Sequence, residues 1–151
     1  ANDNDPSQVV ISGHTGAIER AVGLVKDFGI KRGMILNVSA PFHSSLMAPA
    51  AERMAHALAA TPPGALAVPL YANVTAAPVT DPEESRALLV EQVTGRVRWR
   101  ESVLAMRADG VEHFIELGGK VVGPMVGRTD KDAHVTSLVT MQDLEAFAKS
   151  L

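Results

Sequence analysis

Hydrophobic positions along the chain follow two spacings in turn. Short β-branched or apolar runs bounded by turn residues are typical of strands, and apolar residues three or four apart are typical of amphipathic helices. The predicted strands cover residues 8–12, 34–38, 68–74, 113–117 and 135–139. The predicted helices cover residues 15–28, 46–60, 81–94, 99–108 and 121–127, with a last helix after residue 140. Because strands and helices alternate throughout, the pattern predicts the α/β class.

Two helix starts carry a strong local signal. Asp81 precedes Pro82 and stands three residues before Glu84, so it is a candidate N-cap followed by a proline at the first helical position. Thr140 stands three residues before Asp143, the spacing that lets a hydroxyl and a carboxylate cap the same helix end. Both helices should therefore begin at these positions.

Composition narrows the class of protein. The chain has 151 residues, of which 46% are hydrophobic and 21% charged, with a net charge of -3. This balance argues against disorder and, since there is no basic excess, against nucleic-acid or anionic-membrane binding. No apolar run approaches the ~20 residues that span a bilayer. With no cysteine, disulfides, thiolate zinc and a thiol nucleophile are excluded. We expect a globular, cytoplasmic protein.

Short motifs add little. The five histidines show no paired-ligand spacing, so no metal site is predicted, and Gly-Gly-Lys at 118–120 is interpreted as a strand-to-helix turn rather than a phosphate loop. Three arginines lie around the single tryptophan in residues 96–101, a pattern compatible with nucleic-acid contact. Ordinary solvated arginines at a helix end are favoured instead, because the net charge is negative and one tryptophan is not a stacking platform. Arg98 or Arg100 could equally well pair with Glu91 or Glu101.

His43 is the one candidate for acid–base chemistry. It follows the predicted strand 34–38 in a loop that Pro41 restrains. Parallel α/β proteins commonly place chemistry just beyond a strand end, and histidine titrates near neutral pH. A lone loop histidine is also commonly a surface or capping residue, and the chain contains no G-x-S-x-G serine for a base to activate. The pattern alone leaves both readings open.

Several segments resemble one enzyme family, the malonyl-CoA:acyl carrier protein transacylases. Residues 1–13, the Val-Ser-Ala-Pro-Phe-His run at 38–43, residues 89–103 and the Glu-Leu-Gly-Gly-Lys run at 116–120 match in the family's order. In that family the last turn is more often Gly-Pro-Gly-Lys. The similarity extends over essentially the whole chain.

The resemblance implies a two-part fold. The family has a large α/β-hydrolase-like acyltransferase domain with a ferredoxin-like small domain inserted into it. Residues 1–44 are expected to be part of the ferredoxin-like small domain, and residues 45–151 the C-terminal part of the large domain. The chain would then be a C-terminal half, and its partner would be an N-terminal half that carries the G-x-S-x-G serine.

The resemblance also implies roles for five residues. His43 is the base, and a main-chain carbonyl near Gln92 orients it. Phe42 matches the malonyl-selective form of the signature, and Asn2 and Asn4 resemble asparagines near the substrate cleft. The implied reaction of fatty acid biosynthesis is ping-pong transfer of malonyl from malonyl-CoA, through an acyl-serine, to the phosphopantetheine thiol of acyl carrier protein. No cofactor is implied, and this chain by itself is expected to be inactive.

Two other readings compete. The chain could be a non-catalytic acyltransferase-like module that binds acyl-CoA or acyl carrier protein. It could also contain a regulatory ferredoxin-like ligand-binding domain over residues 8–60, which the continuous match beyond Thr80 opposes. Lys31 and Arg32 are candidate contacts for the acidic acyl carrier protein or ordinary solvated charges.

Overall fold

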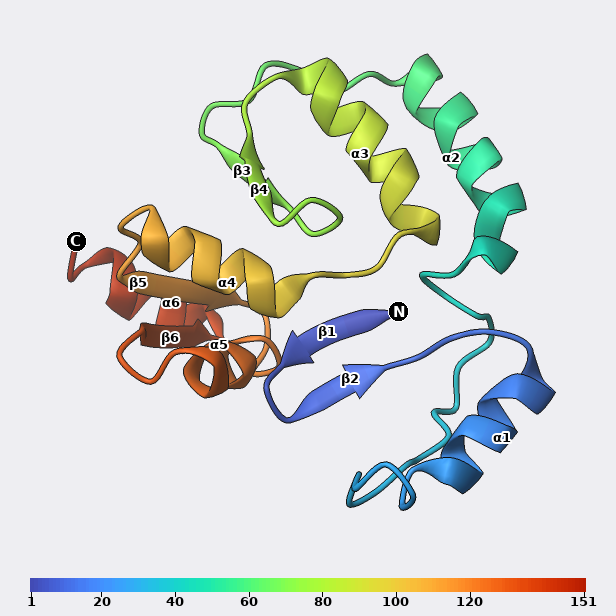
Figure 1. Cartoon of the computed structure of the whole chain (residues 1–151). Helices are drawn as coiled ribbons and strands as arrows, with labels where there is room; N and C mark the ends of the chain where they lie inside the picture. The colour runs from blue at the N-terminus through green and yellow to red at the C-terminus, as the bar shows by residue number, and fades with distance from the viewer.

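The computed structural model describes all of residues 1–151. Six α-helices, one 3-10 turn and six short strands alternate along the chain (Figure 1). The elements are β1 (Asn2–Asp5), β2 (Gln8–Val10), α1 (Thr15–Leu24), η1 (Ser45–Met47), α2 (Ala48–Ala60), β3 (Leu70–Ala72), β4 (Ala77–Val79), α3 (Pro82–Thr94), α4 (Trp99–Ala108), β5 (His113–Leu117), α5 (Gly123–Thr129), β6 (His134–Leu138) and α6 (Met141–Ala148). The predicted α/β class is confirmed.

The strands form three separate two-stranded sheets. β1 pairs with β2, and β3 with β4, both antiparallel, whereas β5 and β6 are parallel, in register from His113 opposite His134 to Leu117 opposite Leu138. α5 provides the crossover between β5 and β6, and α4, which precedes β5, packs against α5 (Figure 1). The parallel pair with its helices is thus one βαβ unit.

The best-buried side chains lie where α4 and α5 meet. Val103 of α4 is 0% exposed and Val126 of α5 is 2% exposed. Both helices also contact β1, which brings the first residues of the chain against elements about a hundred residues later. This contact region is the core that supports the C-terminal half of the fold.

Two ion pairs attach β1 to these helices. Arg100 of α4 donates two hydrogen bonds to Asp3, at 2.9 and 2.7 Å, and Arg128 of α5 donates two to Asp5, at 3.0 and 2.8 Å. The backbone N–H of Asp3 also donates to the carbonyl of Val97 at 2.8 Å. β1 is therefore fixed to the segment that joins α3 and α4.

Several predicted elements are confirmed. The bounds of α4 and β5 are those predicted, and Asp81 accepts the N–H of Glu84 at 2.7 Å as the N-cap of α3. Thr140 and Asp143 form the complete capping box of α6. These elements were predictable because their signals are local.

The strand predicted over residues 34–38 is wrong for this chain. The segment is not part of any sheet, and its apolar side chains are between 48% and 65% exposed. A strand needs a neighbour to pair its backbone groups, and no strand of the chain lies beside this one. The helix predicted over 15–28 ends earlier, at Leu24, and β1 and β4 were not predicted. The other element ends differ by a few residues.

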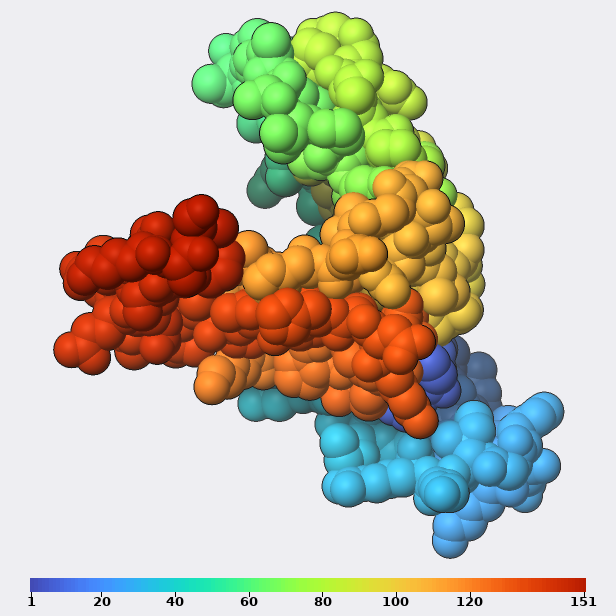
Figure 2. Space-filling view, turned by 90° about the vertical axis from the view of Figure 1, so that its left-hand side faces the viewer, coloured from blue at the N-terminus to red at the C-terminus, as the bar shows by residue number.

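The chain exposes a large surface for its mass. Its accessible area is 10093 Å², whereas a folded monomer of 15.9 kDa is expected to expose about 7,400 Å². Figure 2 shows one reason: the lobe that contains α1 projects from the rest, and the opposite end of the molecule is hollowed. None of the six helices combines the length and hydrophobicity needed to cross a lipid bilayer.

The N-cap of α3 provides a first test of this fold. We expect Asp81→Ala to lower the free energy of unfolding by about 1 kcal/mol, because the N–H of Glu84 loses its acceptor. Asp81→Asn, which retains a capping oxygen, should differ little from the wild type. Urea unfolding of the two variants checks this, and an unchanged stability for Asp81→Ala would contradict the assigned cap.

Candidate active site

The backbone of His43 has an unusual conformation. Its φ is +56°, in the left-handed region that few residues other than glycine adopt. The loop around it is closed by Ser44, whose hydroxyl donates to the carbonyl of Pro41 at 2.7 Å. Such a conformation persists where the surroundings enforce it, and it is common at functional sites. The loop thus holds a half-buried imidazole in one direction.

The acceptor for this imidazole comes from the end of α3. Nδ1 of His43 lies 3.0 Å from the backbone carbonyl oxygen of Gln92, in the last turn of the helix. Carbonyl groups in a last turn have no intrahelical donor, so this one is available to a side chain. α2 and η1, which follow His43, pack against α3 and bring the two segments together (Figure 1).

This hydrogen bond sets the proton positions on the ring. Because a carbonyl only accepts, Nδ1 of His43 carries the hydrogen, and Nε2 of the neutral ring is left as the proton acceptor. The arrangement therefore suits His43 to take up a proton at Nε2.

The side chain of Gln92 does not face His43. Its Nε2 donates to the carbonyl of Gly95 at 3.0 Å, just beyond the end of α3. A Cβ on Gly95 would lie 2.7 Å from a methyl of Val74 and 2.9 Å from the carbonyl oxygen of Glu91, both too close. Neither Ser44 nor Gly95 was singled out from the sequence, since no motif marks a residue that acts through backbone contacts.

The other predicted site residues, Phe42, Asn2 and Asn4, make no hydrogen bond to this pair. Phe42 precedes His43 and is 44% exposed. Asn2 and Asn4 are half-buried on β1, on the face opposite the two aspartates that pair with arginines, because side chains alternate along a strand. Asn2 is bridged to Val97, close to the end of α3.

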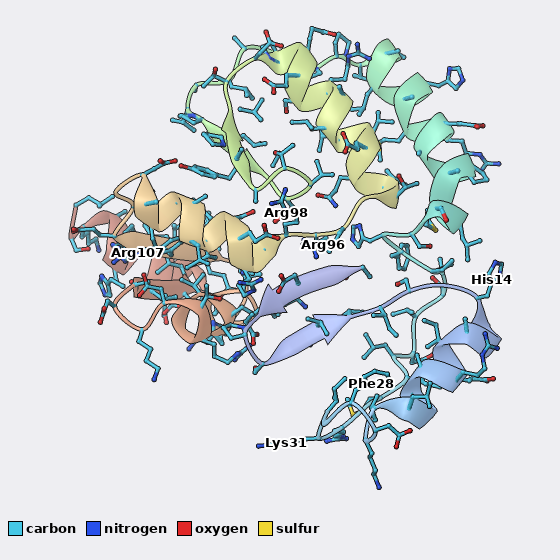
Figure 3. The ribbon with its side chains drawn as sticks, viewed as in Figure 1. His14, Phe28, Lys31, Arg96, Arg98 and Arg107 are labelled. Carbon is cyan, nitrogen blue, oxygen red and sulfur yellow. The ribbon has the colours of Figure 1, made fainter.

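The arginines of residues 96–101 are engaged in ion pairs. Arg98 pairs with Glu101 and also donates to the carbonyl of Thr75, and Arg96 donates to Glu101 at 2.9 Å. Arg96 and Arg98 both lie on the connection between α3 and α4 (Figure 3). The hydrogen bond from Arg98 lowers the pKa of Glu101. Of the two partners considered for Arg98, Glu91 and Glu101, the structure shows Glu101, whereas Arg100 pairs with Asp3, which was not considered.

The Gly-Gly-Lys turn is occupied by a carboxylate of the chain. Glu116 accepts the N–H groups of Val121, Val122 and Gly123 at 2.7–2.9 Å. Desolvation acts to raise the pKa of Glu116, but these hydrogen bonds together with one from Ser137 outweigh it and the pKa is lowered. The N–H groups that would cradle a phosphate are therefore already satisfied, in agreement with the predicted turn.

No metal centre is formed at His43, and two cavities of the chain lie elsewhere. No three His, Cys, Asp or Glu side chains are grouped for a metal ion. One cavity of about 70 Å³ lies beside Trp99 and Phe114, and another of about 280 Å³ lies at the carboxyl ends of β5 and β6. His43 lines neither of them. His43 is half-buried, so part of the residue remains exposed at the surface of this chain.

The loop histidine and the helix-end carbonyl are compatible with a base for acyl transfer, and comparison with known proteins gives the class of protein. The sequence profile of the acyl transferase domain matches residues 1–129, and the chain belongs to this family. It is 38% identical over 152 residues to the malonyl CoA-acyl carrier protein transacylase of Bacillus subtilis, covering 100% of this chain and 48% of that protein. The corresponding protein of Escherichia coli K12 is 40% identical over 151 residues, covering 99% and 48%.

Solved structures give the same result. An acyl-carrier-protein-S-malonyltransferase from Bartonella henselae superposes with a TM-score of 0.94 at 46% identity, over 99% of this chain and 48% of that one. A malonyl-transacylase solved in complex with a type II PKS acyl-carrier protein superposes with a TM-score of 0.93 at 33% identity, over 100% and 49%. The chain spans about half the length of these relatives and matches their C-terminal half.

Proposed function

We propose that this chain is the C-terminal half of a malonyl-CoA:acyl carrier protein transacylase and supplies its general base, His43. The observation that carries the proposal is the 3.0 Å contact between Nδ1 of His43 and the carbonyl oxygen of Gln92. It leaves Nε2 free to accept a proton, as serine-based acyl transfer requires. The family membership and the names of the relatives support the substrates.

The reaction has two half-steps. Nε2 of His43 takes the proton of a serine hydroxyl from the N-terminal half as the serine oxygen attacks the malonyl thioester carbonyl. The tetrahedral intermediate collapses, the carbon–sulfur bond breaks, and the imidazolium returns the proton to the departing coenzyme A thiolate. The carrier-protein thiol then gives its proton to Nε2 and attacks the acyl-serine, and the serine oxygen leaves with that proton. The Gln92 carbonyl keeps Nδ1–H in place throughout.

The large exposed surface of the chain supports the proposal that a further part of the protein packs against it. The accessible area exceeds that of a compact monomer by roughly 2,700 Å², and large apolar side chains are exposed, among them those of residues 34–38. We propose that residues 1–44 belong to the ferredoxin-like small domain and residues 45–151 to the large domain. Residues 34–38 would then pair with a strand of the absent part of the small domain.

The acyl carrier protein is the proposed acceptor. The complex reported for one relative supports a partner of this kind. Lys31 lies at the outer end of the lobe that contains α1 (Figure 3), where it and the neighbouring Arg32 are exposed and could meet an acidic surface. Asn2, which is bridged to Val97 just beyond α3, and Asn4 on the same face of β1 are proposed to contact the substrate.

Transfer of labelled malonate tests the proposed function. The complete protein, supplied with labelled malonyl-CoA and phosphopantetheinylated acyl carrier protein, should label the carrier protein. The isolated 151-residue chain should bind either ligand at most, because it lacks the serine. If the complete protein bound these ligands but did not transfer malonate, the proposed enzymatic function would be wrong, and a non-catalytic acyltransferase-like module would be favoured.

Phe42 provides a test of acyl selectivity. A ring next to the base should crowd a branch at the α-carbon of the acyl group, so we expect Phe42→Ser to raise kcat/KM for methylmalonyl-CoA relative to malonyl-CoA. One methyl group is worth about 1–3 kcal/mol, or roughly 10–200-fold. Phe28→Ser, which changes a ring that is 77% exposed on the α1 lobe (Figure 3), is the matched control. An unchanged ratio in Phe42→Ser would refute the assigned contact.

A further inference from the structure

We propose that the Gln92 side chain and Gly95 are positioning residues that fix the tautomer of His43; this inference rests on the proposed function of His43 as a base. Neither residue touches the imidazole through its side chain. They act on the end of α3, where the carbonyl of Gln92 must point at Nδ1 of His43. A helix end is otherwise prone to fray, so this acceptor needs its own support.

The first support is a hydrogen bond that closes the turn after Gln92. Its amide Nε2 donates to the carbonyl of Gly95 at 3.0 Å, and the N–H of Gly95 donates to the carbonyl of Glu91 at 2.8 Å. The two bonds join residues before and after the end of the helix. They restrict rotation of the peptide group whose oxygen accepts from His43.

The second support is the absence of a side chain at position 95. Gly95 has an ordinary extended backbone, with φ of -79° and ψ of 151°, so its conformation does not require glycine. Glycine is required because of the limited space: a Cβ at position 95 would lie 2.9 Å from the carbonyl oxygen of Glu91 and 2.7 Å from Cγ2 of Val74. The methyl group can rotate away, but relief of the backbone clash displaces the carbonyl next to that of Gln92.

Loss of the Gln92–Gly95 hydrogen bond, or a side chain at position 95, should therefore turn the Gln92 carbonyl away from Nδ1 of His43. With the Gln92 carbonyl displaced, nothing in the chain selects the Nδ1–H form of neutral His43, and part of the population places its hydrogen on Nε2. That form cannot accept the serine proton. The expected signature is a lower kcat with little change in KM, since no residue that binds substrate is altered.

The test uses the complete protein with ¹⁵N-labelled histidine. Gln92→Met removes the amide donor at similar size and helix propensity, Gln92→Glu supplies an acceptor in its place at neutral pH, and Gly95→Ala introduces the Cβ. We expect each to shift the ¹⁵N signals of the neutral His43 ring toward the Nε2–H tautomer and to lower kcat by about tenfold. His43 is assigned from the signal that disappears in His43→Ala.

Two controls separate positioning from stability. Thr94→Val removes another hydrogen bond at the same helix end, from Oγ1 to the carbonyl of Glu91 at 3.3 Å, without touching the Gln92–Gly95 bond. Gly23→Ala adds a Cβ in open space on α1. Both should keep the wild-type tautomer and kcat. The inference is overturned if the folded position-92 and position-95 variants retain the wild-type ¹⁵N signals. Full activity of His43→Ala would instead reject the proposed function.

Discussion

We expect His43→Ala in the complete protein to reduce malonyl transfer by at least about 100-fold, since a positioned general base contributes roughly 10²–10⁴-fold. The structure gives the reason. Nδ1 of His43 is held by the Gln92 carbonyl, which leaves Nε2 as the proton acceptor, and no other histidine of the chain is bonded to a helix-end carbonyl. The loss should appear in kcat for both half-reactions, because the proposed mechanism uses the same nitrogen for the serine and for the carrier-protein thiol.

His56→Ala is the matched control for this variant. His56 lies exposed on α2, the helix that follows the His43 loop, and makes no side-chain hydrogen bond. Its replacement should leave transfer unchanged. Equal activity of the two variants, with both folded as judged by circular dichroism, would show that His43 is not the base.

The second large effect concerns stability. We expect Arg128→Met to lower the free energy of unfolding by about 2–3 kcal/mol, because it leaves a fully buried carboxylate without its cation. Asp5 is 1% exposed and accepts from Arg128 at 3.0 and 2.8 Å. Ser7 would still donate to Asp5 through its N–H and its hydroxyl. The expected loss of unfolding free energy is smaller than for a fully buried ion pair, because 44% of the Arg128 side chain is exposed.

The effect of Arg128→Met should depend on pH with a definite sign. Desolvation acts to raise the pKa of Asp5, but the hydrogen bonds from Arg128 and Ser7 outweigh it and the pKa is lowered. The stabilisation is therefore complete above the unfolded value of about 3.9 and is lost as the pH falls through the lower folded value. Urea unfolding at pH 7 and at stepwise lower pH should show the two proteins converging in acid.

Arg86→Met is the comparison for this ion pair. Arg86 pairs with Glu83 on the surface of α3, where the two side chains are 32% and 63% exposed. Surface pairs of this kind contribute less than about 1 kcal/mol. If Arg128→Met were no more destabilising than Arg86→Met at pH 7, the attachment of β1 to α5 would not contribute as assigned.

The elements that could be predicted from the sequence are those whose signals are local. Asp81 and Thr140 cap helices that begin where their neighbours require, and α4 and β5 have the predicted bounds. β1 could not be predicted, because Asn and Asp are depleted in strands. Its conformation depends on Arg100 and Arg128, which are 97 and 123 residues away from their partners.

Residues 34–38 show the opposite failure. Their composition is that of a strand, but the chain contains no neighbour to complete the pairing, and the segment stays outside every sheet. The candidate site likewise contains features with a local sequence signal and features that depend on distant residues. The loop made His43 a candidate base but left a surface or capping role open as well, and its contact with Gln92, which joins residues 49 positions apart, was implied only by the family resemblance. The role proposed for Gly95 could not be predicted from the sequence, because it depends on the distances from Gly95 to Val74 and Glu91 in the folded chain.

The location of the acyl group tests the central claim most directly. The complete protein is mixed with malonyl-CoA in the absence of carrier protein, quenched, and mapped by peptide mass spectrometry. We predict one malonyl group on a serine outside the 151 residues described here, and its loss from that serine when His43 is replaced by alanine. A malonyl group on a residue within this chain, or acylation of the serine that proceeds equally fast without His43, would contradict the account.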